Sequence, residues 1–62
     1  MTIEEIRKNA PSGATHYYEN DWVVVYHFYC NEIEKWLAYN NTQNYWSSSV
    51  FPYRIPLLKP LY

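Results

Sequence analysis

The residues best suited to chemistry in this chain are two histidines and one cysteine, His16, His27 and Cys30. Histidine is the usual general base near neutral pH, and a cysteine thiolate is a strong nucleophile. His27 and Cys30 are three positions apart in a segment that has the composition of a strand, so their side chains should point to opposite faces. We therefore expect a half-buried histidine and a small buried thiol rather than a Cys–His pair.

Other kinds of reactive site are poorly supported. The two histidines and one cysteine do not match a zinc-binding spacing. A single glycine cannot build a phosphate-binding loop. Glu32 and Glu34 would share one strand face, where we expect them simply to meet solvent. The sequence thus predicts no catalytic residue, no metal ligand and no cofactor, and we expect the protein not to be an enzyme.

Size and composition set a second limit. A 62-residue chain is one domain, and such a core rarely supplies more than ~3–5 kcal/mol of net stability. A single cysteine excludes an intrachain disulfide. Aromatic residues make up 21% of the chain, and each can bury ~150–250 Å². The chain therefore carries more aromatic surface than a core of this size can enclose.

Charge and hydropathy restrict the setting. The net charge is −1 with only five Lys and Arg residues, which argues against nucleic-acid binding through phosphate contacts. The sequence contains no run of 18 apolar residues, so we expect no membrane-spanning helix. The opening "MTIEEIRKNA" lacks the basic and then apolar pattern of a secretion signal, and a free cysteine fits a reducing cytoplasm.

The pattern along the chain predicts an α+β fold, mainly β, in one domain over residues 1–62. Residues 2–9 are expected to form a helix capped by Thr2, with Glu5 at the capping-box spacing and Ile3 and Ile6 docked on the sheet. Strands are expected at about 14–18, 22–30 and 33–40, and a short fourth at 44–46. Together they predict a three- to four-stranded antiparallel meander, with a helix over 32–39 as the alternative for the third strand.

A proline-rich segment, residues 50–62, closes the chain. Pro52, Pro56 and Pro60 lack backbone donors and fix φ, so the segment is expected to be an edge strand or an extended polyproline-like arm. Its apolar side chains can close a face of the same sheet. Alternatively, the arm can lie on another chain and form a homodimer. These apolar residues are Ile55, Leu57, Leu58 and Leu61.

The surplus of aromatic residues indicates a binding surface. Interface hot spots are enriched in Trp, Tyr and Arg, and such residues gather where the secondary structure is weak. We predict that this cluster is a protein interface: Tyr45, Trp46, Phe51, Tyr53 and Arg54. A weaker alternative is a stacking platform for single-stranded nucleic acid, although a basic groove is missing. That platform would comprise Tyr17, Tyr26, Tyr29 and Trp36.

The segment "APSGATHYY" (10–18) resembles the "AP-x-GATHY" opening of very small accessory proteins of tailed bacteriophages and prophages. Those proteins also have a short helix before the motif, spaced tryptophans after it and an "I-x-PL"-type end. Here Trp22, Trp36 and Trp46 take the middle role, and "RIPLLKPLY" ends the chain with an additional "IPLL". The resemblance covers nearly the whole layout, but only "APSGATHYY" matches it letter by letter.

The resemblance implies a phage-encoded protein made in the bacterial host cytoplasm, and it brings no catalytic residue and no cofactor. Small phage proteins of this kind commonly bind a host protein, for example in anti-CRISPR or other anti-defence roles. The leading hypothesis is therefore a protein-binding module that inhibits or redirects a host protein. The alternatives are a self-assembling accessory protein and a single-stranded nucleic-acid binder.

Overall fold

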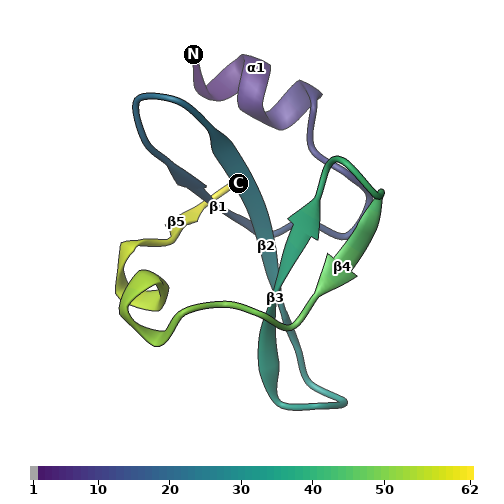
Figure 1. The fold of residues 1–62 in the computed structure, drawn as a ribbon. Coiled ribbons are helices and arrows are strands. Elements are labelled where there is room, and N and C mark those ends of the chain that lie inside the picture. Colours follow the sequence, from purple (N-terminus) through teal and green to yellow (C-terminus); the bar gives the residue numbers. More distant parts are fainter. Residues whose placement is uncertain (1) are drawn as a thin grey trace.

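A five-stranded antiparallel sheet organises residues 2–62, which are the residues that the computed structural model describes (Figure 1). The strand order is β4-β3-β2-β1-β5. The first four strands form a meander, and β5 returns from the proline-rich segment to pair with β1. The predicted α+β class, mainly β, is confirmed. The strands are β1 (His16–Glu19), β2 (Val24–Cys30), β3 (Lys35–Asn40), β4 (Tyr45–Ser47) and β5 (Lys59–Pro60).

Helix α1 (Ile3–Lys8) has the N-terminal cap that its sequence predicts. The Thr2 hydroxyl accepts a hydrogen bond from the Glu5 amide at 3.2 Å, which satisfies one of the free donors of the first turn. Two turns of helix are not stable alone, so the helix depends on docking. Ile6 is buried, whereas Ile3 remains 37% exposed. Ile6 is therefore the main anchor, and the expected docking of Ile3 is only partial.

The turn between β1 and β2 is longer than its composition predicts. The Asn20 side-chain oxygen accepts hydrogen bonds from the amides of Trp22 and Val23, both at 2.9 Å. This side-chain capping holds Trp22 and Val23 in the turn. Consequently β2 begins at Val24, and the prediction of a strand from residue 22 was two residues too long.

The next turn, between β2 and β3, also takes residues that were assigned to a strand. Glu34 has φ 54°, a left-handed conformation that a strand does not contain. Glu32 and Glu34 therefore lie in the turn. The prediction that they share a strand face is wrong. β3 begins at Lys35, and the alternative helix over 32–39 is wrong.

The proline-rich segment is not an extended arm. It folds into a 3₁₀ helix, η1 (Pro52–Leu57), before the edge strand β5. Two consecutive turns are closed by hydrogen bonds from the Arg54 amide to the Phe51 carbonyl and from the Leu58 amide to the Ile55 carbonyl. Each turn has proline at its second position, which proline favours. The four-residue proline spacing thus matches two turns and then an edge strand, where Pro60 costs little.

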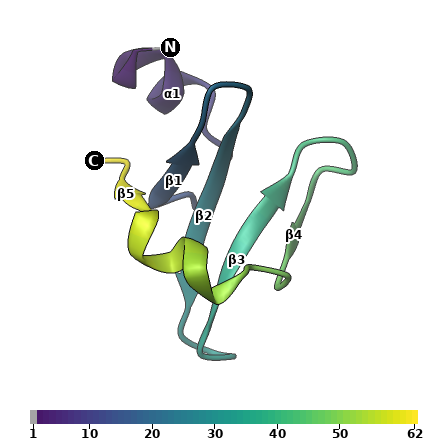
Figure 2. The ribbon, with the colours of Figure 1, turned by 60° about the vertical axis from the view of Figure 1, so that its left-hand side comes forward.

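The two faces of the sheet are covered differently. On one face, Tyr17 and Tyr26 form the core together with Ile6 of α1 and Leu61 after β5. The other face, which carries His16 and His27, lies under the segment from Val50 to Leu57, as a second view shows (Figure 2). Side chains of β2 are therefore covered on both faces, as expected for a central strand.

Replacing Tyr26 with Phe is expected to lower the free energy of unfolding by about 1 kcal/mol. The Tyr26 hydroxyl donates a 2.8 Å hydrogen bond to the Ile6 carbonyl in a buried position and joins α1 to β2. Urea unfolding followed by tryptophan fluorescence measures the change. Tyr17→Phe is the matched control, because Tyr17 is equally buried. Equal stability losses in the two variants would contradict this role for the Tyr26 hydroxyl.

Candidate functional site

Three of the five residues predicted to form an interface come together on the segment around η1. The rings of Phe51 and Tyr53 stack with centroids 5.6 Å apart and an interplanar angle of 20°. Both are exposed, at 56% and 68%. The Arg54 guanidinium lies over the Tyr18 ring, 4.5 Å from its centroid, and 5.9 Å from the centroid of Phe51. We call Phe51, Tyr53 and Arg54 the arm surface.

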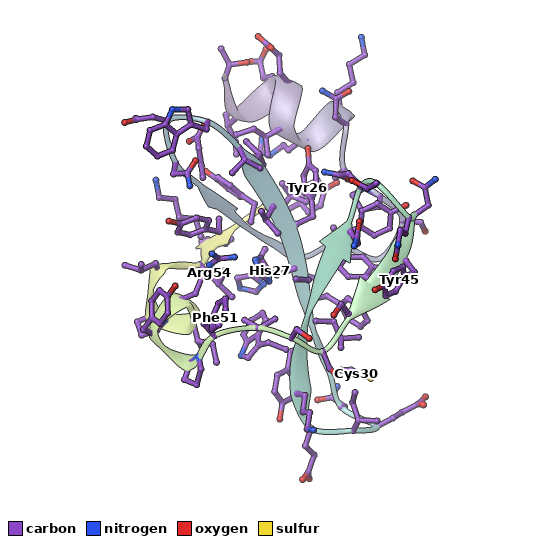
Figure 3. All side chains as sticks on the ribbon, viewed as in Figure 1. Tyr26, His27, Cys30, Tyr45, Phe51 and Arg54 are labelled. Atoms are coloured by element: carbon purple, nitrogen blue, oxygen red, sulfur yellow. The ribbon has the colours of Figure 1, made fainter. Side chains whose placement is uncertain are left out.

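The other two residues, Tyr45 and Trp46, lie on the edge strand β4, away from the arm surface (Figure 3). Trp46 packs edge-to-face on Phe28, with ring centroids 4.6 Å apart, and on Tyr39, at 5.1 Å. Trp46 is therefore part of the packing on the core face. Tyr45 is 48% exposed and neighbours Trp46 in sequence, so it points to the opposite face.

Trp46→Ala is expected to cost roughly 2 kcal/mol of unfolding free energy, because it removes both aromatic contacts and leaves a gap beside the core. Tyr53→Ala is expected to change stability by less than about 0.5 kcal/mol, since the Tyr53 ring faces solvent. Thermal unfolding of both variants by circular dichroism provides the comparison. Similar melting temperatures would mean that Trp46 does not belong to the packed face.

His27 lies beneath η1 and is fully buried. Its ring is beside the Arg54 side chain (Figure 3). Neither ring nitrogen has a hydrogen-bond partner among residues 2–62. Burial lowers the pKa of His27 most. The nearby Leu37 backbone, which does not meet hydrogen-bond geometry, raises the pKa by a polar attraction, and the charges of Arg54 and His16 lower it further. His27 is therefore a neutral imidazole in the folded protein at neutral pH.

The histidines and the cysteine do not form a catalytic arrangement in the described part of the chain. Cys30 pairs across the sheet with Lys35, and His27 pairs with Ala38, which places the two side chains on opposite faces as predicted. His16 lies opposite His27 on β1. The His16 Nδ1 atom is 2.9 Å from the Thr15 hydroxyl, and its ring packs edge-on against Trp36 at 4.9 Å. Residues 2–62 contain no cluster of metal-ligating side chains.

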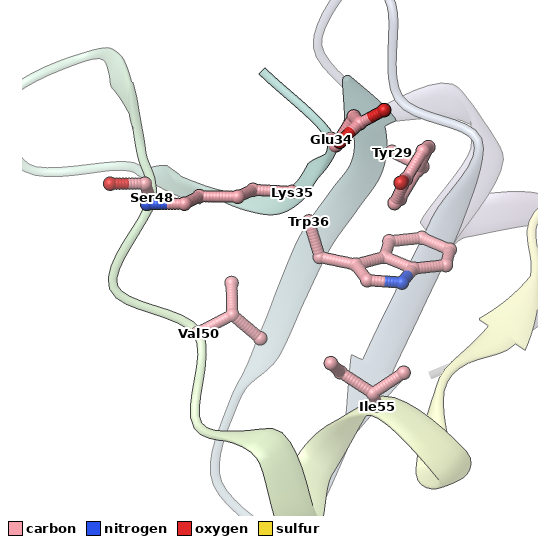
Figure 4. A pocket seen from close by; sticks show the side chains of 7 residues that line it. All are labelled: Tyr29, Glu34, Lys35, Trp36, Ser48, Val50 and Ile55. Carbon is pink, nitrogen blue, oxygen red and sulfur yellow. The ribbon is translucent and has the colours of Figure 1, made fainter. Parts of the chain in front are cut away.

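A pocket of about 320 Å³ opens between the β2–β3 hairpin and the segment around η1 (Figure 4). Its aromatic walls are Tyr29 and Trp36, whose rings meet edge-to-face with centroids 5.5 Å apart. Val50 and Ile55 bound the opposite side (Figure 4). The remaining lining residues are Glu34, Lys35 and Ser48.

The sequence did not predict this pocket. Its aromatic walls depend on the register that pairs Tyr29 with Trp36, and the opposite wall depends on η1 folding back. The candidate nucleic-acid platform is also divided by this register. Tyr17 and Tyr26 are buried in the core, whereas Tyr29 and Trp36 lie on the other face. These four rings therefore do not form one stacking surface.

Trp22 is a further exposed aromatic residue that was assigned to a strand face. It lies in the β1–β2 turn and is 88% exposed, the most of any large apolar side chain between residues 2 and 62. Asn20 and Asp21, two residue types that favour turns, directly precede Trp22, and this signal could have placed Trp22 in the turn. Because Trp22 is far more accessible than Trp46, it is the better control for surface substitutions.

Two further findings concern the described chain as a whole and its similarity to known proteins. No helix within residues 2–62 is long and apolar enough to cross a membrane. Comparison with known proteins gave no match: no protein-family model fits the chain, and no curated protein or solved structure is significantly similar to it.

Proposed function

We propose that this protein is a small protein-binding module whose contact region is the arm surface together with the adjoining pocket. The observation that carries the proposal is the stacked, exposed pair Phe51 and Tyr53 beside Arg54. Large aromatic side chains and arginine dominate binding energy at protein interfaces. Phe51 and Tyr53 are exposed on one short segment, and the half-buried Arg54 lies beside them, so this surface gains stability when a partner covers it.

The arm surface is also well prepared for binding. Two proline-containing 3₁₀ turns hold the backbone of this segment, so less conformational freedom is lost when a partner docks. Arg54 is oriented by the Tyr18 ring beneath it, which leaves little rotamer entropy to lose. A rigid aromatic surface of this kind supports affinity without a large buried area.

For the biological setting, we propose a phage-encoded protein that acts in the bacterial cytoplasm by binding a host protein. The proposal rests on the resemblance of "APSGATHYY" to the opening of small phage accessory proteins. In this setting the protein inhibits or redirects its target without catalysis, as an anti-CRISPR, another anti-defence factor or a host-takeover factor. The geometry at His16, His27 and Cys30 offers no competing catalytic function.

Affinity capture from bacterial lysate tests the proposal. The tagged wild-type chain is compared with Phe51→Ser/Tyr53→Ser and with the control Trp22→Ser/Tyr62→Ser, which removes two rings elsewhere that are more exposed than the arm rings. We expect one dominant host protein with the wild type and the control, and its loss with the arm variant. Equal capture by all three chains, or by none, would overturn the assignment of the arm surface.

Self-association through the proline-rich segment is the second candidate function. The observation that favours it is Leu57, which is 54% exposed on η1 and would be covered in a symmetric dimer. Sedimentation velocity at micromolar concentration is the test. A dimer that Leu57→Ser dissociates would support self-assembly, and a strict monomer would exclude it at that concentration.

A further inference from the structure

We propose that the pocket between the β2–β3 hairpin and η1 binds a basic side chain, lysine or arginine, of the partner protein. This inference rests on the proposed function for the identity of the partner as a protein. Beyond the proposed function, the inference specifies the chemical nature of the partner side chain that enters the pocket. The three features that carry it are the paired aromatic walls, the apolar opposite side and the carboxylate of Glu34.

The aromatic walls favour a cation. The Tyr29 and Trp36 rings meet edge-to-face at an interplanar angle of 71°, so they form a corner of the pocket, and a group in this corner contacts the ring surfaces that border the pocket. The negative faces of such rings attract ammonium and guanidinium groups, and tryptophan does so most strongly. Both rings border the pocket directly (Figure 4). The Tyr29 ring is 42% exposed and is therefore accessible to a ligand.

The opposite side of the pocket fits the stem of a long basic side chain. Val50 and Ile55 face the rings (Figure 4), and apolar walls of this kind pack against the methylene groups of lysine or arginine. The volume of about 320 Å³ is at the lower end of ligand pockets, which span roughly 300–1,000 Å³. Such a space suits one inserted side chain.

The charged residues of the pocket also favour a cation. Glu34 lines the pocket, and in the view of Figure 4 it lies at the same end as Tyr29. The left-handed backbone of Glu34, φ 54°, holds this position at the end of the turn. Lys35 lines the same pocket, but its side chain extends away from both rings toward Ser48 (Figure 4). The negative group is thus at the aromatic end of the pocket, and the positive group points elsewhere.

An NMR titration of the full chain with three matched probes tests the inference. The probes are the N-acetyl methylamides of lysine, norleucine and glutamate. Norleucine keeps the length of the lysine stem without its charge, and glutamate carries a negative charge on a shorter stem. We expect saturable shifts of the Trp36 indole N–H and the Tyr29 ring protons with the lysine probe, and much weaker binding of the other two. Equal binding of norleucine, stronger binding of glutamate, or no saturable shift with any probe would overturn the inference.

Two substitutions sharpen the test. Glu34→Gln should weaken binding of the lysine probe about threefold, the effect of one exposed ion pair. Glu4→Gln on α1 is the matched control and should leave binding unchanged. Tyr29→Leu should abolish binding while the amide spectrum stays folded. Unaltered binding in both Glu34→Gln and Tyr29→Leu would place the lysine probe outside this pocket.

The probe titration and the capture experiment fail independently. If the lysine probe does not bind but the Phe51→Ser/Tyr53→Ser variant loses its partner, the proposed function stands and the pocket assignment falls. If the probe binds but no host protein is captured, the pocket recognises basic groups and the proposed function falls.

Discussion

Replacement of Leu61 with alanine is expected to leave the protein largely unfolded at 25 °C. Leu61 is completely buried in the core with Ile6 and Tyr17, and removal of a buried leucine side chain costs ~2–5 kcal/mol. A domain of this size has only ~3–5 kcal/mol of net stability. Truncation of the Leu61 side chain therefore removes most of the net stability of the domain.

The backbone at Leu61 explains why this position closes the core. The Leu61 amide donates to the Thr15 carbonyl at 2.9 Å, and the Leu61 carbonyl accepts from Arg7 Nε at 2.7 Å. The residue thus joins α1, the start of β1 and the end of the chain. Circular dichroism and urea unfolding measure the effect, with Leu57→Ala as the exposed control, expected within about 0.5 kcal/mol of wild type. Equal stability of the two variants would show that the chain end does not complete the core.

The second large effect is a loss of stability in mild acid that depends on His27. Burial lowers the pKa of His27 in the folded protein below its ordinary value of 6.5, and the charges of Arg54 and His16 act in the same direction. Well above pH 6.5 the imidazole is neutral in both the folded and the unfolded chain, so His27 does not lower the free energy of unfolding there. Below pH 6.5, the unfolded chain binds a proton that the folded chain does not. The free energy of unfolding then falls by up to about 1.4 kcal/mol per pH unit until the folded pKa is reached.

Urea unfolding between pH 7.5 and pH 5 measures this effect. His27→Leu removes the titrating group, so the stability of this variant should be nearly flat with pH. His16→Asn removes the other histidine, which is only half-buried, and should retain most of the wild-type slope. If His27→Leu keeps the full slope, the acid sensitivity belongs to another group and our account of His27 is wrong.

Acid sensitivity at His27 also bears on the arm surface. Arg54, which belongs to that surface, lies beside the buried ring (Figure 3). A charged imidazole there would be next to a guanidinium in a site without a described hydrogen-bond partner. Protonation of His27 is therefore expected to weaken the packing of η1 on the sheet.

The helix and the strands were predictable because local signals determine them. Thr2 and Glu5 mark the start of α1, and β-branched and aromatic residues mark β2. The alternation along β2 correctly separated His27 from Cys30. The ends of the strands were less predictable, because side-chain capping by Asn20 and the left-handed backbone of Glu34 lengthened the turns.

The candidate site was only partly predictable because its geometry is nonlocal. Phe51, Tyr53 and Arg54 are close in sequence, and a short 3₁₀ helix keeps them together. Trp46 was placed in the same cluster by sequence proximity, but its contacts with Phe28 and Tyr39 depend on strand pairing. The pocket depends on both the β2–β3 register and the return of η1 over the sheet. Neither can be read from composition or spacing alone.

Site-specific photo-cross-linking in bacterial cells tests whether the arm surface contacts a host protein. A photoreactive phenylalanine replaces Tyr53 on the arm surface or, as the control, the exposed Trp22. We expect one discrete adduct with a host protein from position 53 and none from position 22. An adduct with a second copy of this chain would indicate self-assembly, and the absence of any adduct at position 53 would contradict a protein-binding arm surface.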